Sequence, residues 1–249
     1  MWKIYDELID LIPEDLTVLD CMVGLHWTLI RSAKGIGAAM TLKGGRAEKE
    51  LANITGMPIK ELATYVKSWD MLQASLGQAA INSVLNTPGN IMAITGQVIT
   101  KTAESDEANA FAQFLPEIAG KRVAVIGHFP NIESLSRTCQ LSILERVPQA
   151  GDYPDPANEY ILPRQDYVFI TGTAFINKTM PRLLQLSPNA KIILVGPSVP
   201  ITPALFNYGV ETLAGMVILD EKLCWQAIRE GGKTKAFKQG GQMVCIRRC

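Results

Sequence analysis

The sequence predicts an α/β protein in which a smaller α+β domain precedes a Rossmann-like domain built on a doubly wound parallel sheet. The carboxyl-terminal half alternates continuous apolar strands with helices, a pattern typical of a parallel sheet that is covered on both faces. The amino-terminal half places short strands before helices, which is the order of an α+β unit. We expect the boundary near residue 100, which gives domains of residues 1–100 and 101–249.

In the amino-terminal half, apolar residues at helical spacing predict helices, and β-rich runs on either side of Gly24-Leu25-His26 predict a hairpin. Pro13 ends the first helix, and Pro58 stands at a plausible first helical position. The expected elements are a helix over 2–12, strands over 17–23, 27–32 and 36–42, and helices over 59–66 and 72–84.

In the carboxyl-terminal half, right-handed crossovers between parallel strands give the doubly wound arrangement. The tail over 229–248 is rich in Lys, Arg and Gly, and we expect it to form a mobile or partner-contacting surface. The expected strands span 122–126, 141–147, 167–171, 191–195 and 213–219, and the expected helices span about 106–118, 131–139, 177–186, 203–208 and 220–231.

Composition excludes several classes of protein. The 249 residues carry 24 Lys and Arg against 24 Asp and Glu, and this balance argues against nucleic-acid binding. No apolar run approaches the roughly 18 residues of a membrane span. Five cysteines without a CxxC pair favour a reduced, cytoplasmic setting, and the first residues do not resemble a signal peptide.

Polar residues follow four successive predicted strands, at the edge where such sheets bind ligands. His128 can act as an acid or base, a hydrogen-bond donor or a metal ligand near neutral pH. The alternative is a loop histidine without a function. Glu145 ends the next strand, where an acid commonly binds a ribose or another diol; the alternative is a solvated carboxylate. Asp152 either adds a carboxylate or only forms a turn.

The segment Thr171-Gly172-Thr173 with Asn177 and Thr179 has the donors of a cradle for an anion or carboxylate, although ordinary helix capping explains it equally well. Gly196-Pro197-Ser198 forms a rigid loop after the next strand. Gly127 makes a tight turn but lacks the GxGxxG fingerprint of dinucleotide binding.

Other candidates are weaker. Lys43-Gly44-Gly45-Arg46 offers two cations for an anion, but solvated loops of this kind are common. His26 beside the hairpin turn is read as a partly exposed surface residue. Cys245 and Cys249, four positions apart, are weak evidence for a metal.

These motifs, in this order, resemble a family known for a proposed role in heavy-metal chelation. The matching stretches are Gly127-His128-Phe129-Pro130, Glu145, Gly151-Asp152, Thr171-Gly172-Thr173-Ala174 with Asn177 and Thr179, Gly196-Pro197-Ser198 and the helix GQAAINSVL from Gly77 to Leu85. The resemblance implies an enolase-type amino-terminal domain followed by a Rossmann-like domain. The barrel that carries the magnesium site of enolase is missing, so enolase chemistry is not implied.

The leading hypothesis is a small-molecule site in the cleft between the halves, for heavy-metal chelation or for handling a metal-binding metabolite, with a divalent transition metal as the candidate cofactor. The rival is an enzyme that uses S-adenosylmethionine or NAD, and a third alternative is a scaffold module; whether any reaction is catalysed stays open. A homodimer is the base-rate expectation. The candidate catalytic residues are His128 and Glu145, the candidate metal ligands are His128, Glu145 and Asp152, and the candidate ligand-binding residues are Gly127, Phe129, Asn131, Thr171, Gly172, Thr173, Asn177, Pro197 and Ser198.

Overall fold

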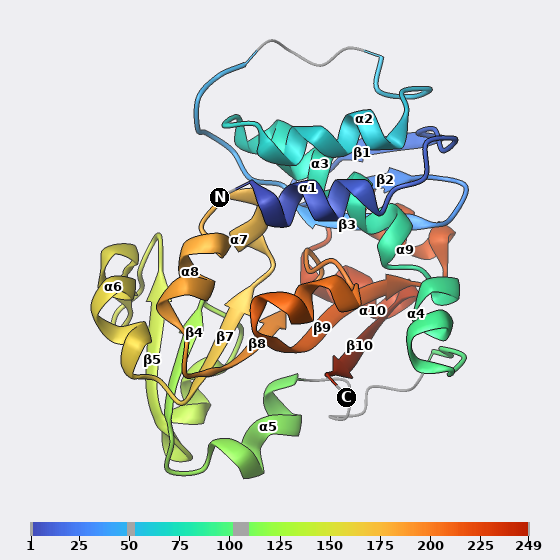
Figure 1. Cartoon of the computed structure of the whole chain (residues 1–249). Coiled ribbons are helices and arrows are strands. Elements are labelled where there is room, and N and C mark those ends of the chain that lie inside the picture. Colours follow the sequence, from blue (N-terminus) through green and yellow to red (C-terminus); the bar gives the residue numbers. More distant parts are fainter. Residues whose placement is uncertain (1, 49–52, 102–109, 249) are drawn as a thin grey trace.

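A computed structural model describes residues 2–48, 53–101 and 110–248. The amino-terminal half contains an antiparallel three-stranded sheet in the order β1-β2-β3, and helices pack on it (Figure 1). The hairpin expected around residues 24–26 is present. The elements are α1 (Lys3–Asp10), β1 (Asp20–Val23), β2 (Trp27–Arg31), β3 (Ile36–Met40), α2 (Ile59–Thr64), η1 (Tyr65–Lys67), α3 (Met71–Leu85) and α4 (Pro88–Thr95).

Helix α3 is the centre of this half, and most of its residues are buried. It begins at Asp70, whose carboxylate accepts hydrogen bonds from the Leu72 and Gln73 backbone N–H groups. Its small residues allow other chain segments to approach closely. A Cβ atom on Gly77 would lie 2.1 Å from the Val66 nitrogen, and one on Gly37 would lie 2.1 Å from the Ala79 oxygen. The helix therefore packs tightly between η1 and β3.

The carboxyl-terminal half is built on a seven-stranded sheet in the order β10-β9-β8-β7-β4-β5-β6. The strands are parallel except for β10, which pairs antiparallel with β9 at one edge. The strands are β4 (Arg122–Ile126), β5 (Gln140–Glu145), β6 (Tyr153–Pro154), β7 (Tyr167–Thr171), β8 (Lys191–Val195), β9 (Val210–Ile218) and β10 (Gly241–Arg247). This arrangement confirms the predicted α/β class.

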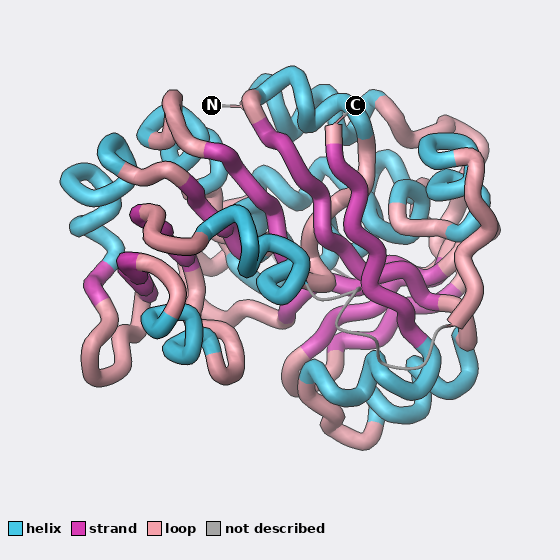
Figure 2. Tube along the Cα trace, turned by 90° about the horizontal axis from the view of Figure 1, so that it is seen from below, coloured by secondary structure: helices cyan, strands magenta, loops and turns pink. Residues whose placement is uncertain are grey.

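Helical segments lie on either side of the strands (Figure 2). Alternate residues of the strands belong to different core clusters: Val123 and Val125 pack with Phe114 of α5, whereas Ala124 and Ile126 pack with the cluster that contains α7 and α8. Both faces are therefore covered, as a doubly wound sheet requires. The helical elements are α5 (Ala110–Ile118), η3 (Ile132–Arg137), η4 (Asp155–Ala157), α6 (Asn158–Ile161), η5 (Leu162–Arg164), α7 (Thr173–Ile176), α8 (Met180–Leu186), η6 (Pro203–Tyr208), α9 (Glu221–Arg229), η7 (Thr234–Ala236) and α10 (Phe237–Gly240).

The two halves share buried cores. One cluster joins α1, α2 and α3 to β4, β7 and β8, and another joins Trp27 and Leu29 of β2 to Met216 of β9 and Phe237 of α10. The Tyr5 hydroxyl donates to the Phe175 carbonyl oxygen at 3.1 Å across the contact. Figure 1 shows the amino-terminal half stacked on one end of the large sheet.

Amide side chains of α3 hold the loop that follows β8. The Asn86 Nδ2 atom donates to the Val199 oxygen at 2.8 Å, and its Oδ1 atom accepts from the Ile201 nitrogen at 2.8 Å. About two helical turns earlier, the Gln78 Nε2 atom donates to the Ser198 oxygen at 3.1 Å. The amino-terminal half is thus fastened to the carboxyl edge of the sheet at β8.

Three sequence-based expectations need correction. The tail over 229–248 forms η7, α10 and the edge strand β10, so the expectation of a mobile surface is wrong. The helix expected over 177–186 begins only at Met180, as α8, because Lys178 has a φ of 65°; the separate short helix α7 precedes the expected range. The segment over 131–139 is the 3-10 turn η3, and residues 106–109 of the helix expected before β4 lie outside the described residues.

None of the helices in the described ranges is long and apolar enough to cross a membrane.

Candidate functional site

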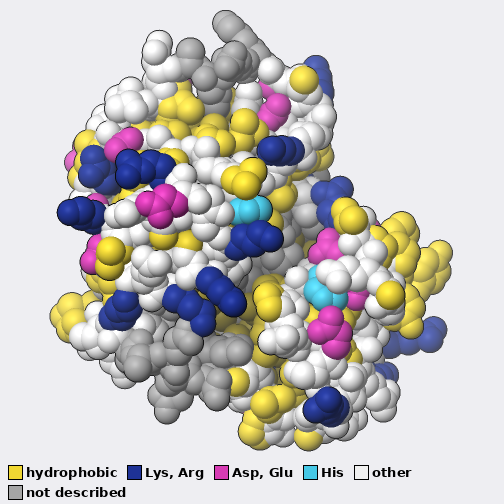
Figure 3. Space-filling model, turned by 180° about the vertical axis from the view of Figure 1, so that it is seen from behind, with side chains coloured by type: hydrophobic (Ala, Val, Ile, Leu, Met, Phe, Trp, Pro, Cys, Tyr) yellow, Lys and Arg dark blue, Asp and Glu magenta, His cyan; other side chains and the backbone are white. Residues whose placement is uncertain are grey.

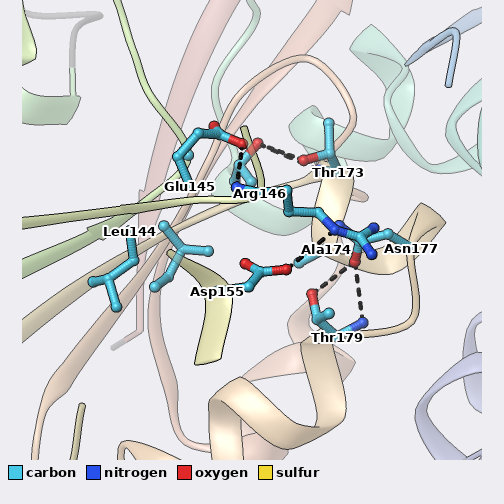
Figure 4. A pocket seen from close by; sticks show the side chains of 11 residues that line it. Leu144, Glu145, Arg146, Asp155, Thr173, Ala174, Asn177 and Thr179 are labelled. Atoms are coloured by element: carbon cyan, nitrogen blue, oxygen red, sulfur yellow. Dashed lines mark hydrogen bonds and ion pairs between the residues drawn. The ribbon is translucent and has the colours of Figure 1, made fainter. Parts of the chain in front are cut away.

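The strand order reverses at β4, because β5 and β6 follow on one side of it and β7, β8 and β9 on the other. In an open parallel sheet such a reversal leaves a crevice at the carboxyl ends of the strands, where ligands bind. A small cavity of about 40 Å³ lies at this point (Figure 4). Its lining residues are Ile126, Gly127, Leu144, Glu145, Arg146, Asp155, Thr171, Thr173, Ala174, Asn177 and Thr179.

Threonine hydroxyls form one wall of this cavity. The Oγ1 atoms of Thr171, at the end of β7, and Thr173, at the start of α7, lie 3.1 Å apart. Gly127 lies opposite and has a φ of 102°, a conformation that L side chains rarely adopt. A Cβ atom there would lie 3.2 Å from the Thr171 side chain. The glycine is therefore needed both for the turn and for the close approach of the two strand ends.

Asn177 and Thr179 form the next part of the wall. The Asn177 Oδ1 atom accepts hydrogen bonds from the Thr179 nitrogen at 3.1 Å and from the Thr179 hydroxyl at 2.6 Å. Its Nδ2 group is left as a donor for a ligand, and Figure 4 shows the side chain directed toward the same space as Arg146. Asn177 thus closes the turn before α8 without capping it, because neither α7 nor α8 has a side-chain cap hydrogen bond, and the cradle stays a prediction.

Arg146 and Asp155 form an ion pair beside this wall, and the sequence analysis did not single out either residue. The Arg146 Nε atom lies 3.1 Å from the Asp155 Oδ2 atom, and Arg146 is half-exposed. Burial raises the pKa of the Asp155 carboxyl, the neighbouring Glu145 charge raises it further, and Arg146 opposes both effects. The signal in the sequence was the position of Arg146, directly after Glu145 at a strand end.

Glu145 holds the loop that follows β4. Its Oε2 atom accepts from the His128 backbone nitrogen at 2.9 Å, and its Oε1 atom accepts from the Arg146 backbone nitrogen at 2.6 Å. The carboxylate stands at the end of β5, as predicted, and lines the cavity. Both of its oxygens are already bonded, which leaves limited capacity for a ribose.

The His128 ring lies between two carboxylates. Its Nδ1 atom is 2.9 Å from Asp152 Oδ2, and its Nε2 atom is 2.9 Å from Glu133 Oε1. Burial of the ring disfavours its charged form, but the hydrogen bonds and charges of Asp152 and Glu133 outweigh this and raise the His128 pKa above its ordinary value. Figure 3 shows a histidine side chain on either side of a hollow, and acidic side chains lie next to the one on the right.

A metal ion bound by protein side chains alone does not fit these residues. Both nitrogens of His128 are paired with carboxylates, and its raised pKa disfavours the neutral ring, which is the form that binds a metal. Within residues 2–48, 53–101 and 110–248, no three or more His, Cys, Asp and Glu side chains are grouped as metal ligands.

The structure places five of the predicted ligand-binding residues outside the cavity lining. Phe129 packs on Phe111, with ring centroids 5.1 Å apart, and the Ser198 hydroxyl accepts a hydrogen bond from the Met40 nitrogen at 2.9 Å. Gly172 is packed against the loop after β8, where a Cβ atom would lie 2.5 Å from the Val199 nitrogen. The five residues are Phe129, Asn131, Gly172, Pro197 and Ser198.

The candidates in the amino-terminal half do not line the cavity either. His26 lies on the β1–β2 turn, and Lys43-Gly44-Gly45-Arg46 packs beside Trp69, whose carbonyl oxygen accepts from the Arg46 nitrogen at 3.0 Å. Cys245 lies on β10, and Cys249 is outside the described residues. All residues that line this cavity belong to the carboxyl-terminal half, whereas the sequence predicts a site in the cleft between the halves.

The protein has a Rossmann-like sheet, a small antiparallel unit at the carboxyl edge of that sheet, and a polar cavity where the strand order reverses. These three features define its class. The chain belongs to the DUF364 family, described as "Putative heavy-metal chelation", whose model matches residues 109–247. A second family model with the same description, DUF4213, matches residues 5–85. The predicted resemblance is thereby confirmed.

Solved and curated relatives agree with this assignment. A DUF364-family protein of unknown function from Desulfitobacterium hafniense is 40% identical, with a TM-score of 0.89 over 100% of this chain and 99% of that one. One from Pyrococcus horikoshii, at 23% identity and a TM-score of 0.77 over 98% of both chains, shows the same fold. An uncharacterised protein of Methanocaldococcus jannaschii is 30% identical over 90% of this chain and 88% of its own length.

Proposed function

We propose that this protein binds a small anionic metabolite that carries a divalent transition metal ion, and that it does so at the cavity beside β4, β5 and β7. The observation that supports this proposal is the mixture of side chains on one small cavity. Hydroxyl, amide, guanidinium and carboxylate groups meet there from three strand ends, whereas the described residues offer no group of three metal ligands. The metal is cargo in this proposal, and the chelating metabolite supplies most of its ligands.

The roles follow from the chemistry of each group. Arg146 binds a carboxylate or phosphate oxygen of the metabolite, because a guanidinium matches the geometry of these groups. Thr171, Thr173 and the Asn177 amide supply neutral hydrogen bonds. Asp155 is left free when Arg146 turns to the ligand, and its oxygens then suit a first-row divalent ion.

The size of the cavity makes movement of Arg146 part of the proposal. A volume of about 40 Å³ holds only a few water molecules. Arg146 is half-exposed, so it can leave Asp155 without crossing the core. His128 and Asp152 do not line the cavity. In this proposal their contact orders the loop that carries Gly127.

The experiment is isothermal titration of the protein with nickel(II) citrate, citrate alone and nickel(II) alone. The complex is expected to bind more tightly than either component. Arg146→Ala removes a charge-assisted hydrogen bond and should weaken binding of the complex about tenfold or more. Arg164→Ala is the matched control, because Arg164 is exposed and outside the cavity lining.

Equal affinity for nickel(II) alone and for its citrate complex would contradict the proposal, as would an Arg146→Ala variant that binds like the native protein. Binding of NAD or S-adenosylmethionine in the same titration, without binding of the nickel(II) citrate complex, would favour the rival proposal of a nucleotide cofactor.

A further inference from the structure

Lys178 is a buried cation that the proposed site does not use. It lies between α7 and α8, is 6% exposed and has a φ of 65°. A lysine has no intrinsic preference for this left-handed conformation, which is strained and persists only where surrounding contacts hold it. The contacts that hold it should therefore be identifiable.

Two contacts fix the amine. The Lys178 Nζ atom donates to the Ile176 carbonyl oxygen at 2.7 Å and lies 5.8 Å from the centre of the Trp69 ring. Trp69 belongs to the amino-terminal half, between η1 and α3. The side chain of Lys178 thus crosses from the carboxyl-terminal half to the amino-terminal half.

Trp69 is itself held in place by other residues of the amino-terminal half. Its ring packs edge-on against Trp2 at 5.9 Å, and its carbonyl oxygen accepts from the Arg46 nitrogen at 3.0 Å. A Cβ atom on Gly45 would lie 2.1 Å from the same oxygen, so only glycine fits beside it. The glycine-rich loop over 43–46 therefore supports the surface on which Lys178 rests.

The neighbours of Lys178 in sequence are Asn177 and Thr179, which both line the cavity and are bonded to each other. We propose that Lys178 is a positioning residue: anchored on Trp69, it holds the left-handed turn that points Asn177 and Thr179 into the cavity. The amino-terminal half thus shapes a site that it does not line. The inference takes the purpose of the cavity from the proposed function, but the geometry it claims exists without any ligand.

The electrostatics agree with a tightly held amine. Burial lowers the pKa of Lys178 to about 8, and the charge of Asp70 only partly opposes this. Because the unfolded chain keeps this proton up to a pH of about 10.4, the unfolded state binds more protons between these values. The contribution of Lys178 to stability therefore becomes more favourable as the pH rises through this window.

The test is hydrogen exchange of the ligand-free protein, read at the Thr179 amide. Lys178→Gly keeps the positive φ and removes the anchor, and we expect the Thr179 amide to exchange about tenfold faster while amides of β8 are unchanged. Trp69→Leu should give the same local increase. Asn131→Gly is the matched control, because Asn131 also has a positive φ, of 59°, but is exposed and distant from Trp69 in sequence and contacts.

Unchanged Thr179 exchange in Lys178→Gly, or in Trp69→Leu, would overturn the inference. A second measurement uses Lys178→Met, which keeps the apolar stem on Trp69. Its free energy of unfolding should rise less than that of the native protein between pH 8 and about 10.4, and parallel curves would contradict the buried anchor. Neither measurement needs a ligand, so failure of the citrate titration leaves this inference standing.

Discussion

At the residue scale, the site depends on charges placed at strand ends. The rule that parallel strands open on one edge predicted Glu145, Thr171 and Thr173 at the cavity, and it placed His128 beside it. The same rule wrongly assigned Ser198 to the ligand site. The sequence does not show that α3 packs on the loop after β8, or that the Ser198 hydroxyl accepts a hydrogen bond from the Met40 nitrogen. It missed Asp155, since an acid between two prolines reads as part of a connection.

The protonation of His128 gives a prediction at this scale. Its pKa is raised in the folded state, so the stability it contributes is complete below the unfolded value of about 6.5 and is lost as the pH rises through the folded value. His128→Gln should remove this loss, and the difference in unfolding free energy between the two proteins should shrink from pH 5.5 to 8. Urea unfolding at several pH values measures it, and a constant difference would contradict the paired ring.

At the element scale, the amide side chains of α3 join the halves. Asn86→Ala leaves the Ile201 nitrogen and two carbonyl oxygens of Val199 and Met216 without their partner. Loss of buried hydrogen bonds of this kind should lower the free energy of unfolding by about 2–4 kcal/mol. Asn207→Ala, at an exposed position, is the control in urea unfolding. If Asn86→Ala lowers the free energy of unfolding by less than about 0.5 kcal/mol, the hydrogen bonds of Asn86 do not hold the halves together.

Close packing of α3 gives a second prediction from an element. Gly77→Ala places a Cβ atom 2.1 Å from a backbone nitrogen, whereas Gly89 in α4 has open space around its Cα atom. We expect Gly77→Ala to cost about 2 kcal/mol or more, and Gly89→Ala to be neutral or to stabilise by up to about 1 kcal/mol. Thermal unfolding of both variants decides it, and equal effects would refute the packing argument.

The elements themselves were largely predictable. Apolar periodicity located α1, α2, α3 and every parallel strand except the short, exposed β6, because burial imposes that pattern directly. It failed at β10, where the strand is an edge with mixed exposure and Lys233, Lys235 and Lys238 shortly precede it. It also failed at Lys178, since nothing in the local sequence predicts a positive φ for lysine; only the distant contact with Trp69 explains it.

At the scale of the whole molecule, the halves share buried cores, and the hydrogen bonds of Gln78 and Asn86 join them further. We therefore expect the two halves to unfold as one cooperative body. Differential scanning calorimetry should therefore show a single unfolding transition, with equal calorimetric and van't Hoff enthalpies. Two separated transitions would mean that the halves unfold independently. The boundary near residue 100 and the homodimer stay predictions, because the fold of one chain tests neither.

In the proposed function, a metal ion reaches the strand reversal at β4 bound to a small chelator. The most direct measurement is an anomalous difference map, recorded at the nickel absorption edge, from crystals grown with nickel(II) citrate. The account predicts a peak beside Asp155, with Arg146 turned away from that carboxylate and toward the citrate. A peak on the His128 ring without citrate, or an Arg146–Asp155 pair that stays closed with no nickel beside it, would contradict it.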